Sequence, residues 1–120
     1  MVINWNNSAS EISRQIRALW SAPGASSNYR KQRVKFVPDE HLSSLAVVDS
    51  GEVVPALPHS QPGQILSCDK RGIIIKCGQG FLKINSLQFP GGRPLKAAEI
   101  SNGRKLQVGE YFEGEDFKME

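Results

Sequence analysis

The first hydrophobic pattern in the chain is helical and lies near the N-terminus. Four large apolar residues recur at helical spacing and form one stripe: Ile12, Ile16, Leu19 and Trp20. Ser8 and Glu11 have the spacing of a capping box, in which each side chain accepts from the other residue's amide. The pattern predicts a helix from about Ala9 to Trp20, ended by the Ala-Pro-Gly at 22–24. Arg17 lies off the stripe and is predicted to be solvated.

Most of the remaining pattern alternates with the period of β-strands. Val34 and Phe36 share one face of a strand at 33–37. Residues 64–68 and 73–77 flank a turn and form a predicted hairpin. In its register Cys68 pairs with Ile73 and Cys77 with Gln64. One face of the hairpin then holds Leu66, Cys68, Ile73, Ile75 and Cys77.

The pattern continues into a further strand after Gly78-Gln79-Gly80. Leu82 and Ile84 are predicted to face inward, and Lys83 outward. Leu87 falls out of phase with them, which predicts a bulge near Asn85–Ser86.

The C-terminal third adds a short helix and a strand. The helix is predicted from Pro94 or Leu95 to Ser101, and a last strand is predicted at about 110–112. Residues 38–62 hold four prolines and predict a long surface loop with a short strand near 45–48. Short strands, tight turns and few helices indicate a mainly β domain, a small barrel or sandwich.

Composition places this pattern in one globular domain. The chain has 120 residues, of which 39% are hydrophobic and 22% charged. Its apolar runs are too short for a membrane span, and its N-terminus lacks the features of a signal peptide. We therefore expect a cytoplasmic protein without a membrane partner. The domain is expected to cover residues 1–112, followed by a flexible acidic tail at 113–120.

The two cysteines suggest neither a disulfide nor a metal site. In the hairpin register they lie about four positions apart, roughly 13 Å, which is too far for a bond between them. Two histidines distant from them complete no metal-ligand spacing, so no metal is expected. Both thiols are predicted to be free and mostly buried.

Charge is uneven along the chain, although the net charge is only +3. Residues 12–38 hold six basic side chains and no acidic one, and residues 69–105 hold eight basic against two acidic. Such blocks are either solvated faces or a surface for a polyanion.

The glycine clusters at 78–80 and 91–92 raise the question of a phosphate site. Lys83 is followed by Ile84 inside a strand pattern, so a Walker-type loop is excluded. Pro-Gly-Gly-Arg-Pro at 90–94 is either a turn or an anion site beside Arg93 at a helix start. No nucleophile, base and acid occur together in the pattern, so no catalytic residue is expected.

Six segments in order resemble the C-terminal domain of methionyl-tRNA formyltransferase. They are INWNNSASEISRQIRAL (3–19), APGA (22–25), PGQIL (62–66), CGQGFLKINSLQ (77–88), GGRP (91–94) and GRKLQVGEYF (103–112). Residues 38–60 match poorly. The resemblance implies a small open OB-like β-barrel with an N-terminal helix and a short C-terminal helix.

The same resemblance implies a non-catalytic accessory domain that presents the acceptor arm of methionyl-tRNA through a basic surface. Its partner would be an N-terminal Rossmann-like formyltransferase domain, which holds the catalytic residues and uses 10-formyltetrahydrofolate. No cofactor is expected in this chain. The alternative is a structural or docking barrel of a formyltransferase that acts on an amino-sugar, a folate or a carrier-bound amino acid.

Five basic residues are the candidate phosphate contacts. They are Lys70, Arg71, Lys76, Lys83 and Arg93.

Overall fold

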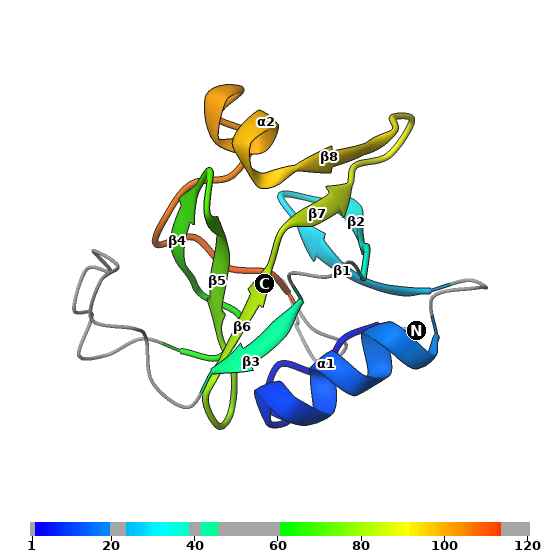
Figure 1. Ribbon diagram of the computed structural model, residues 1–120, viewed down its shortest axis with the longest axis vertical. Helices are drawn as coiled ribbons and strands as arrows, with labels where there is room; N and C mark the ends of the chain where they lie inside the picture. Colours follow the sequence, from blue (N-terminus) through cyan, green and yellow to red (C-terminus); the bar gives the residue numbers. More distant parts are fainter. Residues whose placement is uncertain (1, 20–23, 39–41, 46–60, 114–120) are drawn as a thin grey trace.

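A computed structural model of the chain describes residues 2–19, 24–38, 42–45 and 61–113. The predicted loop residues at 46–60 and most of the predicted tail, 114–120, lie outside the described residues. The described strands form two four-stranded antiparallel sheets, with two helices beside them (Figure 1). The fold is mainly β and the described strands close no barrel, which agrees with the predicted open architecture.

The two sheets are distinguished by their strand order. The first sheet has the order β1-β2-β7-β8 and the second β3-β6-β5-β4. The elements in chain order are α1 (Ala9–Ala18), β1 (Ala25–Tyr29), β2 (Gln32–Phe36), β3 (Ser43–Leu45), β4 (Ile65–Asp69), β5 (Gly72–Lys76), β6 (Phe81–Ile84), β7 (Ser86–Gln88), β8 (Pro94–Lys96) and α2 (Ala97–Asn102).

Helix α1 forms where the capping pattern places it. Ser8 Oγ accepts from the amide of Glu11 at 3.2 Å, and Ile12 and Ile16 are fully buried. Leu19 is 38% exposed at the C-cap, so its predicted place on the buried stripe is wrong. The Arg17 guanidinium donates to Ser13 Oγ at 2.7 Å and to the carbonyl of Leu42. Arg17 is exposed, as predicted, and these hydrogen bonds also join α1 to the start of β3.

The β4–β5 hairpin has the predicted turn, but the strand register at its open end differs from the predicted one. Cys68 pairs with Ile73 as predicted, but the register shifts by one residue between Ile65 and Ser67. Ile65 then pairs with Ile75 and enters the core, whereas Leu66 is buried outside the core cluster. The predicted pairing of Cys77 with Gln64 is wrong because this bulge absorbs one residue.

Both cysteines are free, as predicted; Cys77 is buried, whereas Cys68 is only partly buried, and burial affects the chemistry of both. It raises the pKa of Cys68 to about 11 and that of Cys77 to about 12. At pH 8 we expect the folded chain to be alkylated at least about 100-fold more slowly than the unfolded chain, because the thiolate is the reactive form. Since both folded pKa values exceed the unfolded value, stability should fall as pH rises from about 8.5 towards 11. Equal alkylation rates with and without denaturant would contradict this burial.

The chain passes from the second sheet to the first at Asn85, between β6 and β7. Leu82 and Ile84 lie in the core, as predicted, and so does Leu87 in the other sheet. The change of phase predicted as a bulge is therefore a corner at which one strand line serves both sheets (Figure 1).

The segment before the short C-terminal helix is a strand. Pro94–Lys96 form β8, which pairs with β7, and α2 begins only at Ala97. The predicted helix start at Pro94 or Leu95 is wrong by two or three residues. A hairpin turn at Pro90-Gly91-Gly92 connects the two strands, with Gly91 at φ +77° and the Gly92 amide donating to the carbonyl of Phe89.

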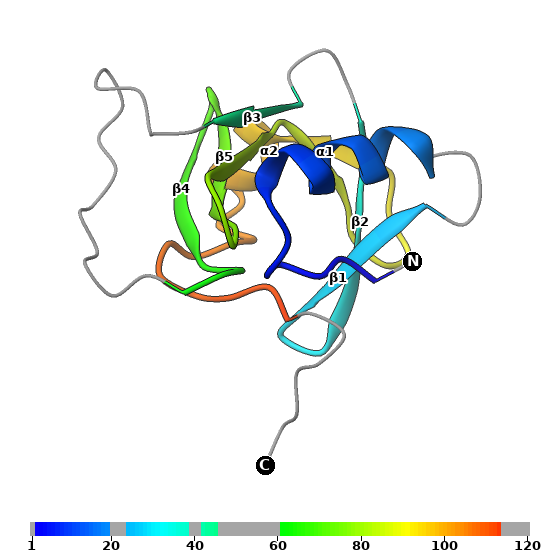
Figure 2. The same ribbon diagram turned by 90° about the horizontal axis from the view of Figure 1, so that it is seen from below.

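Residues 109–113 join the two sheets where a last strand was predicted. They form only isolated bridges, Gln64 with Tyr111 in the second sheet and Asn28 with Glu113 in the first. Figure 2 shows this orange to red segment running from the β4 side to the β1–β2 hairpin. Phe112 packs its ring 5.2 Å from Phe36 and so closes one end of the core.

The core lies between the two sheets. It takes residues from both sheets and from α1, among them Val34, Phe36 and Leu87, Ile73, Ile75, Leu82 and Ile84, and Ile12 and Ile16. The alternating partners of these residues therefore point away from the core. The outer faces of the two sheets consequently lie on different sides of the domain.

Candidate nucleic-acid interface

Two of the predicted phosphate contacts form the tip of the β4–β5 hairpin. Lys70 and Arg71 are both exposed and occupy the turn between Asp69 and Gly72. Asp69 organises this turn, because its carboxylate accepts from the Arg71 amide at 2.8 Å and from the Arg71 guanidinium at 3.2 Å. Burial raises the pKa of the Asp69 carboxyl, but these hydrogen bonds and the charges of Arg71 and Lys83 outweigh it and hold the pKa below its usual value.

Two more of the candidate residues lie on the outer face of the same sheet. Lys76 and Lys83 are partly exposed and alternate with core residues of β5 and β6. The Lys76 ammonium lies 5.3 Å from the centroid of Phe81, its cross-strand partner. The methylene chain of Lys83 lies beside Gly72, the first residue of β5 after the hairpin tip. The structure therefore places Lys70, Arg71, Lys76 and Lys83 on one sheet, with Lys76 at the opposite end of β5 from the hairpin tip. We call these four residues the second-sheet cluster.

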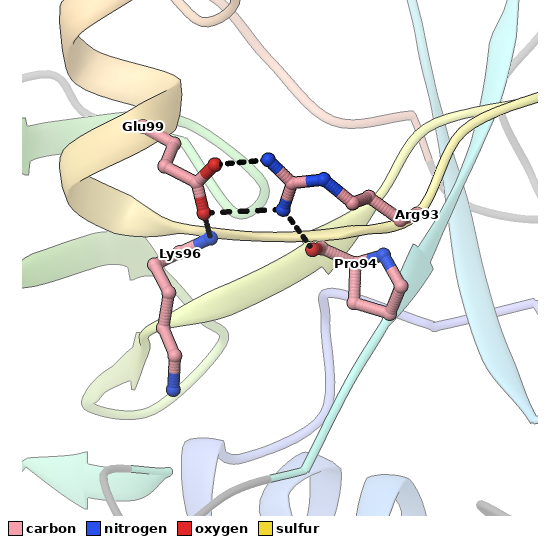
Figure 3. Close-up of polar contacts among 4 residues, drawn as sticks. All are labelled: Arg93, Pro94, Lys96 and Glu99. Carbon is pink, nitrogen blue, oxygen red and sulfur yellow. Dashed lines mark hydrogen bonds and ion pairs between the residues drawn. The ribbon is translucent and has the colours of Figure 1, made fainter.

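The fifth candidate, Arg93, lies apart from this cluster. It follows the β7–β8 turn and pairs with Glu99 of α2 at 2.6 Å (Figure 3). The Glu99 carboxylate also accepts from the Lys96 amide and so caps the helix. The hydrogen bond from Arg93 lowers the pKa of Glu99. An anion at this helix start would compete with the Glu99 carboxylate, and the turn interpretation of this segment is the one supported.

The first glycine cluster is a tight corner rather than a phosphate loop. Gly80 has φ +76°, as a turn residue does, whereas Gly78 does not have a positive φ. Gly78 is needed for a close approach, because its Cβ would lie 1.8 Å from the Asn6 carbonyl oxygen. Its amide donates to the carbonyls of Trp5 and Asn7, which fixes the N-terminal segment against the sheet.

The other basic block lies on the first sheet. Arg33 and Lys35 alternate with the buried Val34 and Phe36, so they point away from the core on the outer face. The Arg33 guanidinium donates to Asn28 Oδ1 at 3.0 Å and to Ser26 Oγ at 3.2 Å. Arg33 and Lys35 thus lie on a different sheet from the second-sheet cluster.

Arg30 and Lys31 occupy the two-residue turn of the β1–β2 hairpin, both with positive φ. Arg30 forms a bidentate ion pair with Glu110, which raises the pKa of the guanidinium and lowers that of the carboxyl. A cavity lies beside this turn, and sequence reasoning did not find it. The sequence feature that could have indicated it is Arg30-Lys31, two basic residues at hairpin-turn positions where Asn-Gly is the common choice.

Within the described residues, no three side chains of His, Cys, Asp or Glu gather closely enough to hold a metal. None of the described helices is long and apolar enough to cross a membrane.

Comparison with known families decides what kind of domain this is. The profile of the family described as Formyl transferase, C-terminal domain, matches residues 1–105. The chain belongs to this family. The match includes both sheets, α1, α2 and all five candidate contacts.

Individual relatives agree with this assignment of a formyl transferase C-terminal domain. The chain is 35% identical over 112 residues to a methionyl-tRNA formyltransferase of Dechloromonas aromatica, covering 93% of this chain and 32% of that protein. It is 39% identical over 111 residues to one of Verminephrobacter eiseniae, covering 92% and 32%. A relative with the same name from Sulfurihydrogenibium sp. is 33% identical over 112 residues, covering 92% and 32%. The chain spans about a third of the length of these curated relatives.

Proposed function

We propose that this formyl transferase C-terminal domain holds a tRNA for a catalytic domain that precedes it. The catalytic N-terminal domain would use 10-formyltetrahydrofolate to formylate methionyl-tRNA, and this chain would present the acceptor arm without supplying a catalytic residue. The observation that carries the proposal is the second-sheet cluster, in which four cations lie on one sheet of a domain whose relatives are named methionyl-tRNA formyltransferases.

The cluster has the chemistry of phosphate binding without sequence recognition. Lys70 has no hydrogen bond or ion pair with any other described residue, and it projects from the hairpin tip with Arg71. Lysine and arginine contacts to phosphates position a nucleic acid but do not distinguish its bases. Binding should therefore be weak and similar for initiator and elongator tRNA, with Kd of about 10⁻⁴–10⁻⁶ M at physiological salt.

A salt titration with matched variants tests this proposal. Four phosphate contacts predict a slope of log K against log salt of about −3, because each contact releases counterions. The double variant Lys76→Glu/Lys83→Glu should flatten this slope by about two units and weaken binding at low salt. The control Arg33→Glu/Lys35→Glu changes net charge by the same amount on the outer face of the other sheet. It should change the slope by less than about one unit.

Three outcomes separate the alternatives. Equal loss in both double variants would mean that only net charge matters, which contradicts a defined surface. No binding of either tRNA at low salt, by a chain shown to be folded, would favour a docking barrel of a formyltransferase with another substrate. Tight discrimination between the two tRNAs would contradict readout by phosphates alone.

A further inference from the structure

A cavity of about 270 Å³ lies between three segments that are far apart in the sequence. Its walls come from the β1–β2 hairpin, the turn after β7 and the segment after α2. The lining residues are Tyr29, Arg30, Gln32, Phe89, Pro90 and Lys105. The volume is slightly below the range usual for small-molecule sites, so the cavity is limited to one small ligand.

The charged groups at this cavity favour an anion. Arg30 and Lys105 both line it, and none of the six lining residues is acidic. The Glu110 carboxylate is not one of the six lining residues, but it pairs with the Arg30 guanidinium and hydrogen-bonds with the Tyr29 hydroxyl, so the uncompensated positive charge at the cavity is that of Lys105. Lys105 has no ion pair with a described residue, and its ammonium lies 5.6 Å from the centroid of Phe89.

An aromatic ring and an amide provide contacts that a simple anion would not need. Phe89 is only partly buried against the core, so part of the ring borders the cavity. Gln32 is exposed, and its side chain makes no hydrogen bond with a described residue, which leaves the side-chain amide able to donate and accept. Tyr29 forms a fixed wall, because its ring is buried and its hydroxyl accepts from the Gln107 amide at 3.1 Å.

The backbone around the cavity is unusual in the same places. Among the described residues, three that are not glycine have positive φ: Arg30 at 49°, Lys31 at 66° and Arg104 at 53°. All three are basic and belong to the two loops that supply Arg30 and Lys105. At Arg30 and Lys31 a two-residue hairpin turn requires this conformation, and the unusual feature is that basic residues stand there in place of Asn-Gly.

From this combination we propose that the cavity binds one unstacked nucleotide. The base stacks on Phe89 with its edge facing the Gln32 amide, and the phosphate lies between Lys105 and Arg30. The flexible Lys105 stem lets the ammonium move from the ring face to the phosphate when a base stacks there. The nucleotide is either free or part of a single strand. Binding of a nucleotide within a single strand rests on the proposed function, whereas binding of a free nucleotide does not.

Amide chemical shifts of the 120-residue chain test the site directly. The probes are cytidine 5′-monophosphate, single-stranded tetracytidylate and inorganic phosphate. We expect saturable shifts at the amides of Arg30, Gln32, Phe89 and Lys105 with both nucleotide probes, and much weaker ones with phosphate. Shifts of the same size with phosphate at equal concentration would mean an anion site without base contact, which overturns the proposal. Absence of shifts at millimolar nucleotide overturns it as well.

Variants identify the individual contacts. Phe89→Ala should weaken nucleotide binding about 5- to 150-fold, the range for losing one base–aromatic stack. Lys105→Gln should reduce the salt slope by about one unit, and Lys70→Gln, an exposed lysine outside the cavity, should not change it. Gln32→Ala keeps the fold intact at an exposed position and should also weaken binding. If Phe89→Ala, Lys105→Gln and Gln32→Ala all bind as the unaltered chain does, the proposal is wrong.

Two further comparisons distinguish a free nucleotide from a single strand, and this inference from the proposed function. Tetracytidylate binding at least about tenfold more tightly than the mononucleotide would assign the site to a strand, and equal affinity would assign it to a free nucleotide. Reversal of Lys76 and Lys83 should leave these cavity shifts unchanged. Loss of tRNA binding with intact cavity shifts would therefore count against the proposed function alone, and the reverse result against this inference alone.

Discussion

Replacing Ile16 with Asp is expected to unfold the domain or remove most of its stability. Ile16 is fully buried in α1, and α1 packs against β3 and β6. A carboxylate there has no partner and must either ionise away from water or bind a proton, at a cost of several kcal/mol. We expect the free energy of unfolding, measured with urea, to fall by about 4 kcal/mol or more.

Arg14→Asp is the matched control for this variant. Arg14 lies on the same helix, is exposed, and its side chain makes no hydrogen bond or ion pair with a described residue. Its effect should stay within about 0.5 kcal/mol. Arg17 is not a suitable control, because its guanidinium bonds Ser13 and the Leu42 carbonyl. Similar losses for Ile16→Asp and Arg14→Asp would mean that the buried face of α1 is assigned wrongly.

Replacing Gly78 with Ala is expected to be nearly as damaging, although it adds only a methyl group. The new Cβ would lie 1.8 Å from the Asn6 carbonyl oxygen and 2.6 Å from its carbon. Both contacts are to backbone, so neither can be relieved by a side-chain rotation. Relief requires moving the segment whose Trp5 and Asn7 carbonyls accept from the Gly78 amide. We expect a loss of about 3–5 kcal/mol in the free energy of unfolding.

Gly92→Ala provides the corresponding control in the other glycine cluster. Its Cβ would meet nothing nearer than the Phe89 carbonyl oxygen at 3.7 Å, an ordinary contact. Because Gly92 does not have a positive φ, alanine should leave stability unchanged or raise it by about 0.4–1 kcal/mol. Thermal and urea unfolding of both variants measure this contrast. A tolerated Gly78→Ala would show that the N-terminal segment does not pack against this corner.

Local patterns in the sequence were sufficient where one element carries its own signal. The cap at Ser8 and the spacing of Ile12 and Ile16 correctly predicted the start and buried face of α1. Alternation around a two-residue turn correctly predicted the tip of the β4–β5 hairpin. The same alternation could not reveal the bulge at Leu66, because Ile65 and Leu66 are equally apolar and only the packing decides which one faces the core.

Strand β1 was missed because a buried polar residue hides its alternation. Ser27 is fully buried and faces the core between Ala25 and Tyr29. Its hydroxyl accepts from the Trp5 indole at 3.0 Å and donates to the Glu113 carbonyl at 2.7 Å. Both partners are far away in the sequence, so nothing local marks Ser27 as a core position.

Part of the candidate nucleic-acid interface could also be predicted from local sequence patterns. Strand alternation correctly predicted that Lys76 and Lys83 point away from the core, and the turn placed Lys70 beside Arg71. The sequence could not reveal that Arg93 is paired with Glu99, since this contact depends on where β8 ends and α2 begins. The cavity beside Arg30 depends on three segments meeting, and no single segment predicts it.

The most direct test of the proposed function is to map a bound tRNA onto the two outer faces of the domain. Amide chemical shifts of the isotope-labelled chain would be followed during a tRNA titration at low salt. We predict that the shifts concentrate at Lys70, Arg71, Lys76 and Lys83, and that the outer face carrying Arg33 and Lys35 is spared. Shifts concentrated on that first-sheet face, or none at all with the chain folded, would contradict a tRNA surface on the second sheet.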